Sequence, residues 1–478
     1  MEMGEGMREE GIKESPRGFL NVLRNIGPGI VLSGAVIGSG ELLVTTRMGA
    51  KFGYIFLWGV ILCCLIKYFV QVELGRFCIS SNLTSVQAFN HFPIRKVRGT
   101  NILNIFFFAI MVMITPALAG IFGSCAGLVY SLFPAIPAKL WGVILYVSVI
   151  IILWRGYYKD VEGLVVVLVG CFSLAILICF FLMQGTKYHV TGSEFLTGFS
   201  LKIPTGGMPM AMALMGSLGV TAGELFMYPY WLKEKGYGRY VGPQTGTNKE
   251  EWARRQRGWM AVLKADALIC TLIATVITIV YYIVAASILH YGLGIVPTGM
   301  GVVEGLANMF TESYGRWSYG IFMFGAFCTL YSSLYVVAAF CGRAWTDLFD
   351  SLKIIKADSP EARLKWHRFF QMFWPALWLI FFLGIPKPMT ILIWGLRFNG
   401  LWLPFLSLGV AYLAKVAISE GKLSRGASIA LWATIGCILV YTMGYFVLST
   451  GEPLFYRWGF STLTAAFTIY TIVVCARR

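Results

Sequence analysis

Two acidic residues lie inside long apolar stretches of the chain, and each follows a run of small residues. Glu41 ends the sequence Gly-Ser-Gly-Glu at 38–41, and Glu224 ends Thr-Ala-Gly-Glu at 221–224. Carboxylates, hydroxyls and freed backbone carbonyls are the ligands that a hard cation such as Mg²⁺ prefers. They also hold an organic ammonium through charge-assisted hydrogen bonds. The pattern therefore predicts a cation-binding site that contains both acids.

The same two acids allow a structural interpretation. Each Glu stands where a helix would resume after the small residues, so its carboxylate would cap the amino-terminal end of that helix. Because an ionisable residue in an apolar segment is costly and usually serves a function, we favour the cation site. The two roles are compatible in different conformations.

Other small or polar residues accompany these acids. We expect Gly38, Ser39, Thr221 and Gly223 to take part in cation binding, with Thr221 as a third metal ligand, and Lys67, Arg397, Asn399 and Tyr228 to modulate the site. Lys67 would pair with one of the acids or extend its ammonium to the membrane surface. Arg397 would gate the site, bind an anionic part of a substrate, or form a salt bridge with a loop acid. Asp266, close to Lys264, is expected to be a local helix-end feature.

The elements that must position these residues are membrane-spanning helices. Of the 478 residues, 57% are hydrophobic and 13% are charged, about half the charge of a soluble domain. A span needs about 20 mostly apolar residues. Twelve stretches meet this need, at about 26–48, 53–75, 102–132, 138–154, 162–184, 208–231, 259–289, 317–342, 369–385, 388–416, 428–449 and 457–475. The composition predicts an all-α integral membrane protein with about twelve spans.

The formal net charge of +16 is explained by topology. Most of the Lys and Arg residues fall in the segments on the same side as the amino terminus, as expected for cytoplasmic loops. We therefore expect a multi-pass protein of the cell (plasma or inner) membrane with both termini in the cytoplasm. Its partner would be the lipid bilayer, and no nucleic-acid role is needed.

The two acid-containing segments also form an internal repeat. Aligned without gaps, Gly-Glu-Leu at 40–42 falls on Gly-Glu-Leu at 223–225, five spans later. Gly, Ser and Thr are poor helix formers, so we expect unwound backbone at 36–40 and 218–223. Interrupted spans at matching places in two halves are typical of transporters built from inverted repeats.

The first two spans resemble a known family. Gly-Pro-Gly at 27–29 is followed, eight residues later, by the segment 38–41 and then by Gly-Ala-Lys-Phe-Gly-Tyr at 49–54. This series resembles the Nramp (natural resistance-associated macrophage protein) metal-ion transporters, as does Leu-Pro-Phe at 403–405. The resemblance implies a LeuT-type fold of five plus five inverted spans with helices one and six broken. It divides the chain into a cytoplasmic segment at 1–25, a transport core at 26–416 with repeats at 26–184 and 208–416, and two added spans at 428–478.

The chain departs from this family at the metal site. The family's Asp and Asn ligands correspond to Gly38 and Glu41, and its Met and His correspond to Thr221 and Gly223. The third span, at 101–133, lacks the family's acidic residues. Loss of the Met thioether removes the ligand that favours transition metals over hard cations. The altered motif therefore predicts a different metal selectivity.

These observations predict a secondary transporter and not an enzyme. The four His residues are scattered, and no P-loop or nucleophile motif is present, so we expect no cofactor and no nucleotide. The leading expectation is alternating-access transport of a cation, a hard divalent metal in the first place, past Glu41 and Glu224. The alternatives are transport of an organic cation or zwitterion, and a non-transporting sensor or scaffold on the same fold.

Overall fold

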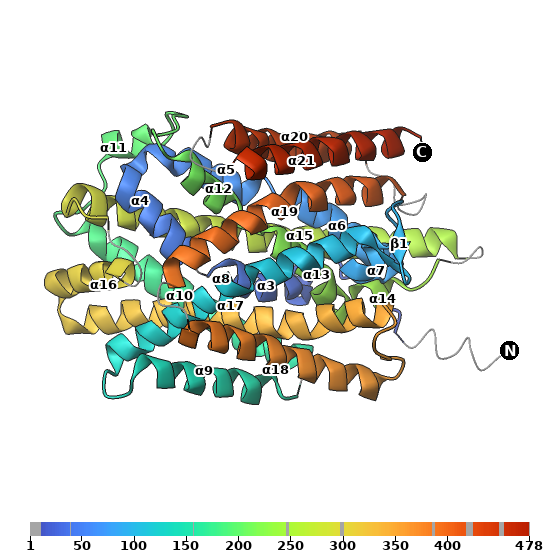
Figure 1. Ribbon diagram of the computed structural model, residues 1–478, viewed down its shortest axis with the longest axis horizontal. Helices are drawn as coiled ribbons and strands as arrows, with labels where there is room; N and C mark the ends of the chain where they lie inside the picture. The colour runs from blue at the N-terminus through green and yellow to red at the C-terminus, as the bar shows by residue number, and fades with distance from the viewer. Residues whose placement is uncertain are drawn as a thin grey trace.

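The computed structural model describes residues 11–38, 40–155, 157–244, 248–296, 301–384, 388–416, 424–448 and 454–477. Most of these residues are helical, because a helix satisfies its own backbone hydrogen bonds in lipid. The helices run along the long axis of the molecule and pack side by side (Figure 1). In the described part, β1 (Lys96–Val97) and β2 (Thr100–Asn101) form a small antiparallel hairpin. The all-α fold class is confirmed.

The elements follow one another in this order. The first part of the chain forms α2 (Phe19–Asn25), α3 (Pro28–Val36), the π-helix η1 (Gly40–Thr45), α4 (Thr46–Phe52), the 3₁₀-helix η2 (Gly53–Phe56), α5 (Leu57–Leu65), α6 (Tyr68–Ser81), α7 (Ser85–Phe89), α8 (Ile102–Leu132), α9 (Ala138–Leu153), α10 (Tyr158–Gln184) and α11 (Gly192–Thr197). The second part forms α12 (Met208–Met215), α13 (Ala222–Lys235), α14 (Tyr237–Val241), α15 (Lys249–Ala285), the π-helix η3 (Ala286–Gly292), α16 (Gly301–Tyr314), α17 (Arg316–Ser351), α18 (Pro360–Gly384), α19 (Pro388–Val416), α20 (Arg425–Leu448) and α21 (Leu454–Ala476).

In each predicted span, most of the described residues are helical. By length and hydropathy, seven of the described helices are able to cross a membrane, or eight if the bent pair α2 and α3 forms one span. The count of twelve therefore stays a prediction. The helix α16 was not predicted. The helix α18 begins at Pro360, before the predicted span at about 369–385, because its first turns are polar and the search for apolar stretches did not include them.

The interrupted spans lie in the interior of the bundle. In Figure 1, α3, α8, α13 and α17 are central, α9 and α18 lie along one edge, and α20 and α21 lie along the opposite edge. The long helix α17 packs against α3, α8, α10 and α18, and α19 packs against α8 and α12. This arrangement surrounds both breaks with side chains from spans three, eight and ten.

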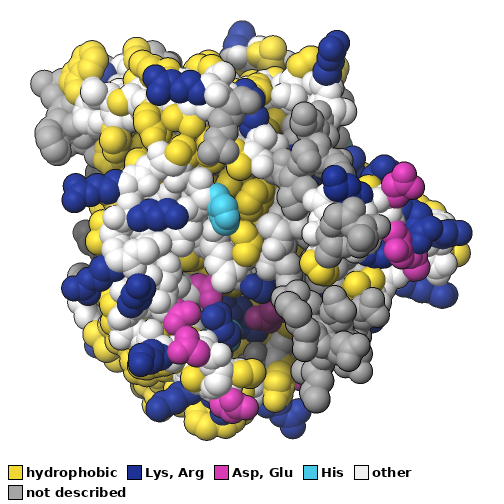
Figure 2. Space-filling view, turned by 90° about the vertical axis from the view of Figure 1, so that its right-hand side faces the viewer, with side chains coloured by type: hydrophobic (Ala, Val, Ile, Leu, Met, Phe, Trp, Pro, Cys, Tyr) yellow, Lys and Arg dark blue, Asp and Glu magenta, His cyan; other side chains and the backbone are white. Residues whose placement is uncertain are grey.

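One end of the bundle is rich in charged side chains. Figure 2 faces that end, which carries α7, α14 and the carboxyl-terminal end of α21, and Lys and Arg side chains are spread over it. Asp and Glu side chains lie beside a hollow in the same face. The positions of these charges agree with the predicted cytoplasmic side, whose orientation stays a prediction.

Candidate functional site

The break in the first span is short. The helix α3 ends at Val36, and the chain resumes helical geometry at Gly40 as the π-helix η1. Glu41, fully buried, accepts a hydrogen bond at Oε2 from the amide of Gly38 (3.1 Å). The hydroxyl of Ser333 in α17 donates to carbonyls at the end of α3, among them Ala35 O (3.2 Å). The predicted cation-binding residue Ser39 lies outside the described residues.

The break in the sixth span is longer. The helix α12 ends at Met215, and α13 begins at Ala222. Glu224 accepts hydrogen bonds from the amide of Thr221 (3.1 Å) and from its hydroxyl, which forms a capping box at the start of α13. The predicted unwinding of both segments is confirmed, although the second break begins earlier, at Gly216, and leaves Gly223 inside the helix.

The two acids share one local geometry. Each carboxylate accepts a hydrogen bond from the backbone amide three residues before it, at Gly38 and at Thr221. The internal repeat seen in the sequence is thus repeated in the hydrogen bonds, and the capping interpretation of both acids is correct. Capping satisfies amide groups that a helix start leaves free.

Two neighbouring cavities that share lining residues lie beside the second acid, Glu224. The inner one, of about 60 Å³, is lined from both breaks and from spans three, eight and ten. Its polar lining residues are Ser217, Thr221, Glu224, Ser333 and Asn399. The adjoining one, of about 80 Å³, shares Glu224 and Asn399 with it.

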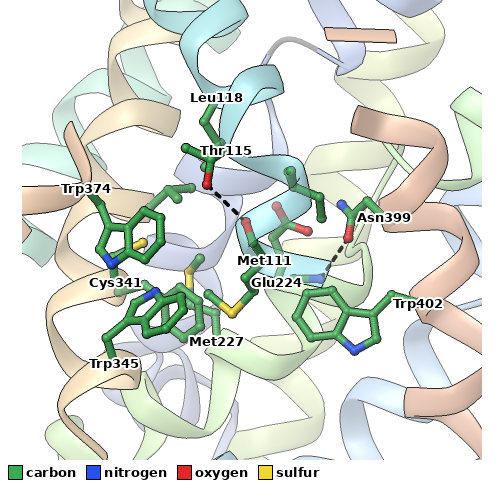
Figure 3. A pocket seen from close by; sticks show the side chains of 14 residues that line it. Met111, Thr115, Leu118, Glu224, Met227, Cys341, Trp345, Trp374, Asn399 and Trp402 are labelled. Atoms are coloured by element: carbon green, nitrogen blue, oxygen red, sulfur yellow. Dashed lines mark hydrogen bonds between the residues drawn. The ribbon is translucent and has the colours of Figure 1, made fainter. Parts of the chain in front are cut away.

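The adjoining cavity has an aromatic and sulfur-containing wall. Figure 3 shows Glu224 near its centre, with Trp345 and Trp374 on one side and Trp402 on the other. The thioethers of Met111 and Met227 also line it. The sequence did not point to these residues, since aromatic and Met side chains in apolar spans are usually packing residues.

The first acid does not line either cavity. Besides the amide of Gly38, Glu41 accepts at Oε1 a hydrogen bond from the amide of Gly219 in the other break (3.3 Å). Glu224, in contrast, keeps part of its surface accessible. Glu41 as a direct cation ligand therefore stays a prediction, and its contacts favour a structural role.

Lys67 neither reaches the membrane surface nor pairs directly with an acid. It is fully buried at the junction of α5 and α6. Its Nζ donates to the carbonyls of Met215 (2.8 Å), the last residue of α12, and of Leu218 (2.6 Å) in the second break. Among the ion pairs of the described residues, none joins Lys67 to Glu41 or Glu224 within 4.0 Å.

Asn399 in α19 joins three parts of the second break. Its Nδ2 donates to Gly216 O (3.0 Å) and to the hydroxyl of Thr221 (2.7 Å), and its Oδ1 accepts from the amide of Gly223 (3.3 Å). The expected modulating position of Asn399 is therefore inside the site. Arg397, two residues earlier, is half-buried and does not line either cavity.

Tyr228 is not part of the cavities. Its hydroxyl donates to Asp266 Oδ2 (2.7 Å). Asp266 also accepts from the amides of Gly27 (2.8 Å) and Gly29 (2.7 Å) at the start of α3. The expectation that Asp266 is a local feature is wrong, because its carboxylate caps α3 through the amide of Gly27, which lies 239 residues earlier in the chain. No local sequence pattern predicts a contact between residues so far apart in the chain.

The described residues contain no group of three or more His, Cys, Asp or Glu side chains arranged to hold a metal ion. The donors around the inner cavity are instead oxygen atoms, with a single carboxylate among its lining residues, that of Glu224. The hydroxyl of Ser217 in this lining is buried and has no hydrogen-bond partner in the described part of the chain. The donor set suits a hard cation that keeps some of its water.

Comparisons with known proteins agree with this fold. The family model for natural resistance-associated macrophage protein-like proteins matches residues 29–449. The divalent metal cation transporter MntH of Xylella fastidiosa is 25% identical over 278 residues, which cover 56% of this chain and 53% of that protein. The chain thus spans about half the length of this curated relative.

Solved structures show the same architecture. The manganese transporter of Eremococcus coleocola, in complex with an aromatic bis-isothiourea substituted compound, superposes with a TM-score of 0.70 at 16% identity, covering 97% of both chains. Mhp1, a nucleobase-cation-symport-1 family transporter, superposes with a TM-score of 0.54 at 13% identity, covering 95% of this chain and 92% of that one. The LeuT-type fold is confirmed, and the chain belongs to the natural resistance-associated macrophage protein-like family of multi-pass membrane proteins.

Proposed function

We propose that this protein is a secondary transporter that moves a hard divalent cation across the membrane by alternating access, with Glu224 as the anionic group that attracts the cation. The observation that carries the proposal is the position of Glu224. Its carboxylate lines both cavities and is partly accessible, at the break between α12 and α13. The relatives described above include a divalent metal cation transporter and a manganese transporter.

The chemistry of the inner cavity supports a hard cation. Its polar lining is a carboxylate, an amide and three hydroxyls, without sulfur or imidazole among the described residues. Ser217 offers a hydroxyl oxygen that no other described group uses. A cavity of about 60 Å³ has room for a small cation with one or more waters, since one water needs only about 10–15 Å³ by this measure.

The two breaks provide the place for alternating access. They touch each other, because a Cβ on Gly40 would collide with the backbone of Ser217. Because each of these spans is already interrupted, its two half-helices can tilt relative to each other without the unwinding of a continuous helix. The cation would be exposed to one side of the membrane at a time while it stays beside Glu224.

A second candidate is transport of an organic cation. The aromatic wall of the adjoining cavity favours it, since Trp345, Trp374 and Trp402 lie around Glu224 (Figure 3). Indole rings attract cations through their negative faces. An ammonium group at Glu224 would then place its apolar part between these rings.

Flux into liposomes that contain the purified protein tests both candidates. We expect Mg²⁺ or Mn²⁺ to enter with wild type and not with Glu224→Gln. Glu194→Gln is the matched control, because Thr191 and Glu194 form the same kind of capping box in α11, away from the cavities. Flux of tetraalkylammonium or choline without divalent flux would select the second candidate. Absence of flux for all of these ions would contradict the proposed transport.

A further inference from the structure

The break in span six is bound by side chains from several other spans. Its free groups belong to the end of α12, the six residues from Gly216 to Thr221, and the start of α13. Unsatisfied backbone groups cost several kcal/mol each at membrane depth. The carbonyls of Met215 and Leu218 are taken by a single side chain, Lys67 of span two.

One peptide unit of this break lies between two opposite charges. The carbonyl of Leu218 accepts from Lys67 Nζ (2.6 Å), and the amide of Gly219 in the same peptide bond donates to Glu41 Oε1 (3.3 Å). Gly219 permits this arrangement with a positive φ of 59° and with the backbone of Cys64 only 2.9 Å from where its Cβ would be. Span two therefore packs directly against the break.

The carbonyl oxygens of Met215 and Leu218 lie around the ammonium of Lys67 as ligands lie around a bound cation. Backbone carbonyls freed by a broken helix typically coordinate the ions of such transporters. Here a primary ammonium takes these ligands. It is fully buried.

We propose that Lys67 is a resident cation of the transport site, whose ammonium occupies the position at the break in span six that would otherwise need a bound monovalent ion. Lys67 is a positioning residue. It holds the carbonyls of Met215 and Leu218, and it balances the charge of Glu41 through the peptide bond between Leu218 and Gly219. The transported cation is left with Glu224, and transport needs no Na⁺ or K⁺ as a second ion.

Removal and replacement of the ammonium test this assignment. Lys67→Ala leaves a space at the break, whereas Lys67→Met fills most of it with an uncharged chain. We expect both variants to lose flux by roughly tenfold or more, because hydrogen bonds from a charged donor are lost. Ammonium or methylammonium ions are expected to restore Lys67→Ala and not Lys67→Met, and tetramethylammonium, which is too large, is expected to restore neither.

A stability measurement separates this inference from the proposed function. The flux test of Lys67 rests on the proposed function, and the stability test does not. The melting temperature in detergent needs no transport. We expect ammonium to raise it in Lys67→Ala and to leave wild type and Lys67→Met unchanged, at equal ionic strength. If Lys67→Ala is not recovered folded, Lys67→Arg is compared with Lys67→Met, and only the charged variant is expected to keep the wild-type melting temperature.

Three results would overturn the assignment. Lys67→Ala with wild-type flux and melting temperature would show that the ammonium is dispensable. Equal effects of ammonium on the Ala and Met variants would show that no specific site is refilled. Wild-type flux that requires Na⁺ or K⁺ would show that a second ion is bound elsewhere.

Discussion

The two breaks share the sequence Gly-Glu-Leu at 40–42 and 223–225 and are stabilised differently. In span one the interruption is short, and carbonyls at the end of α3 accept the hydroxyl of Ser333. In span six the interruption covers six residues, and charged or amide side chains from three other spans, Glu41, Lys67 and Asn399, bind its backbone. A longer break frees more backbone groups, and each one needs a partner in the absence of water.

This difference separates the roles of two acids at equivalent positions. Both carboxylate oxygens of Glu41 accept hydrogen bonds from backbone amides, one in each break. Glu224 caps its own helix through Oε2 and faces the cavities. Equivalence in the repeat therefore does not imply equivalence in function, because the surroundings of the two residues differ.

The largest expected effect comes from neutralising each acid in turn. Glu224→Gln should lower cation flux by about two to three orders of magnitude, because a charge-assisted ligand is lost and each 1.4 kcal/mol corresponds to a factor of ten. Glu41→Gln should lower the melting temperature more than it lowers flux, because an amide group then faces an amide donor of Gly38 or Gly219. Flux in liposomes and melting in detergent measure the two effects. A larger loss of flux in Glu41→Gln would reverse the comparison.

Adding a methyl group to each break should give the next largest effect. In Gly216→Ala the new Cβ meets backbone atoms of Leu396 and Gly400 in α19, which cannot move easily, whereas in Gly38→Ala it meets the side chain of Ser333. We expect Gly216→Ala to destabilise the protein by about 2 kcal/mol, within the usual range for overpacking, and Gly38→Ala by less. Denaturation of the purified variants measures the difference, and equal losses would contradict this account of the breaks.

A smaller effect is expected for metal selectivity at the second break. Cd²⁺ should bind wild type no more than modestly better than Mg²⁺, since Thr221 provides oxygen where the family has sulfur. Thr221→Met should raise Cd²⁺ affinity by roughly tenfold, because a thioether favours soft ions. Calorimetry measures both. Thr191→Met, in the capping box of α11, is the control and should change nothing. If wild type bound Cd²⁺ more tightly than Mg²⁺ by orders of magnitude, the predicted loss of preference for soft ions would be wrong.

The smallest expected effect concerns pH and decides whether the two acids share a proton. Cation affinity should weaken in acid, since protonated Glu224 no longer attracts a cation. If the acids act separately, as their different contacts indicate, Glu41→Gln should keep this dependence. Binding titrations at several pH values measure it. A dependence that disappears in Glu41→Gln would instead support a proton shared by the pair.

The sequence by itself determined the elements and the places where they break. Long apolar runs imply helices in a membrane, and Gly, Ser and Thr before Glu41 and Glu224 imply local unwinding, because both properties depend on neighbouring residues. The equal capping hydrogen bonds at Gly38 and Thr221 follow from the same local rule. The resemblance of the first two spans to a family was sufficient for the fold.

Only the tertiary structure decided which side chain serves which break. Lys67 binds carbonyls 148 and 151 residues away, and Asp266 accepts from the amide of Gly27, 239 residues before it, at the start of α3. The tryptophans around Glu224 come from α17, α18 and α19. The residue type determines which groups a side chain is able to bind. The packing of distant helices sets which partner is within reach, and in a membrane each buried polar group takes the partner that this packing provides.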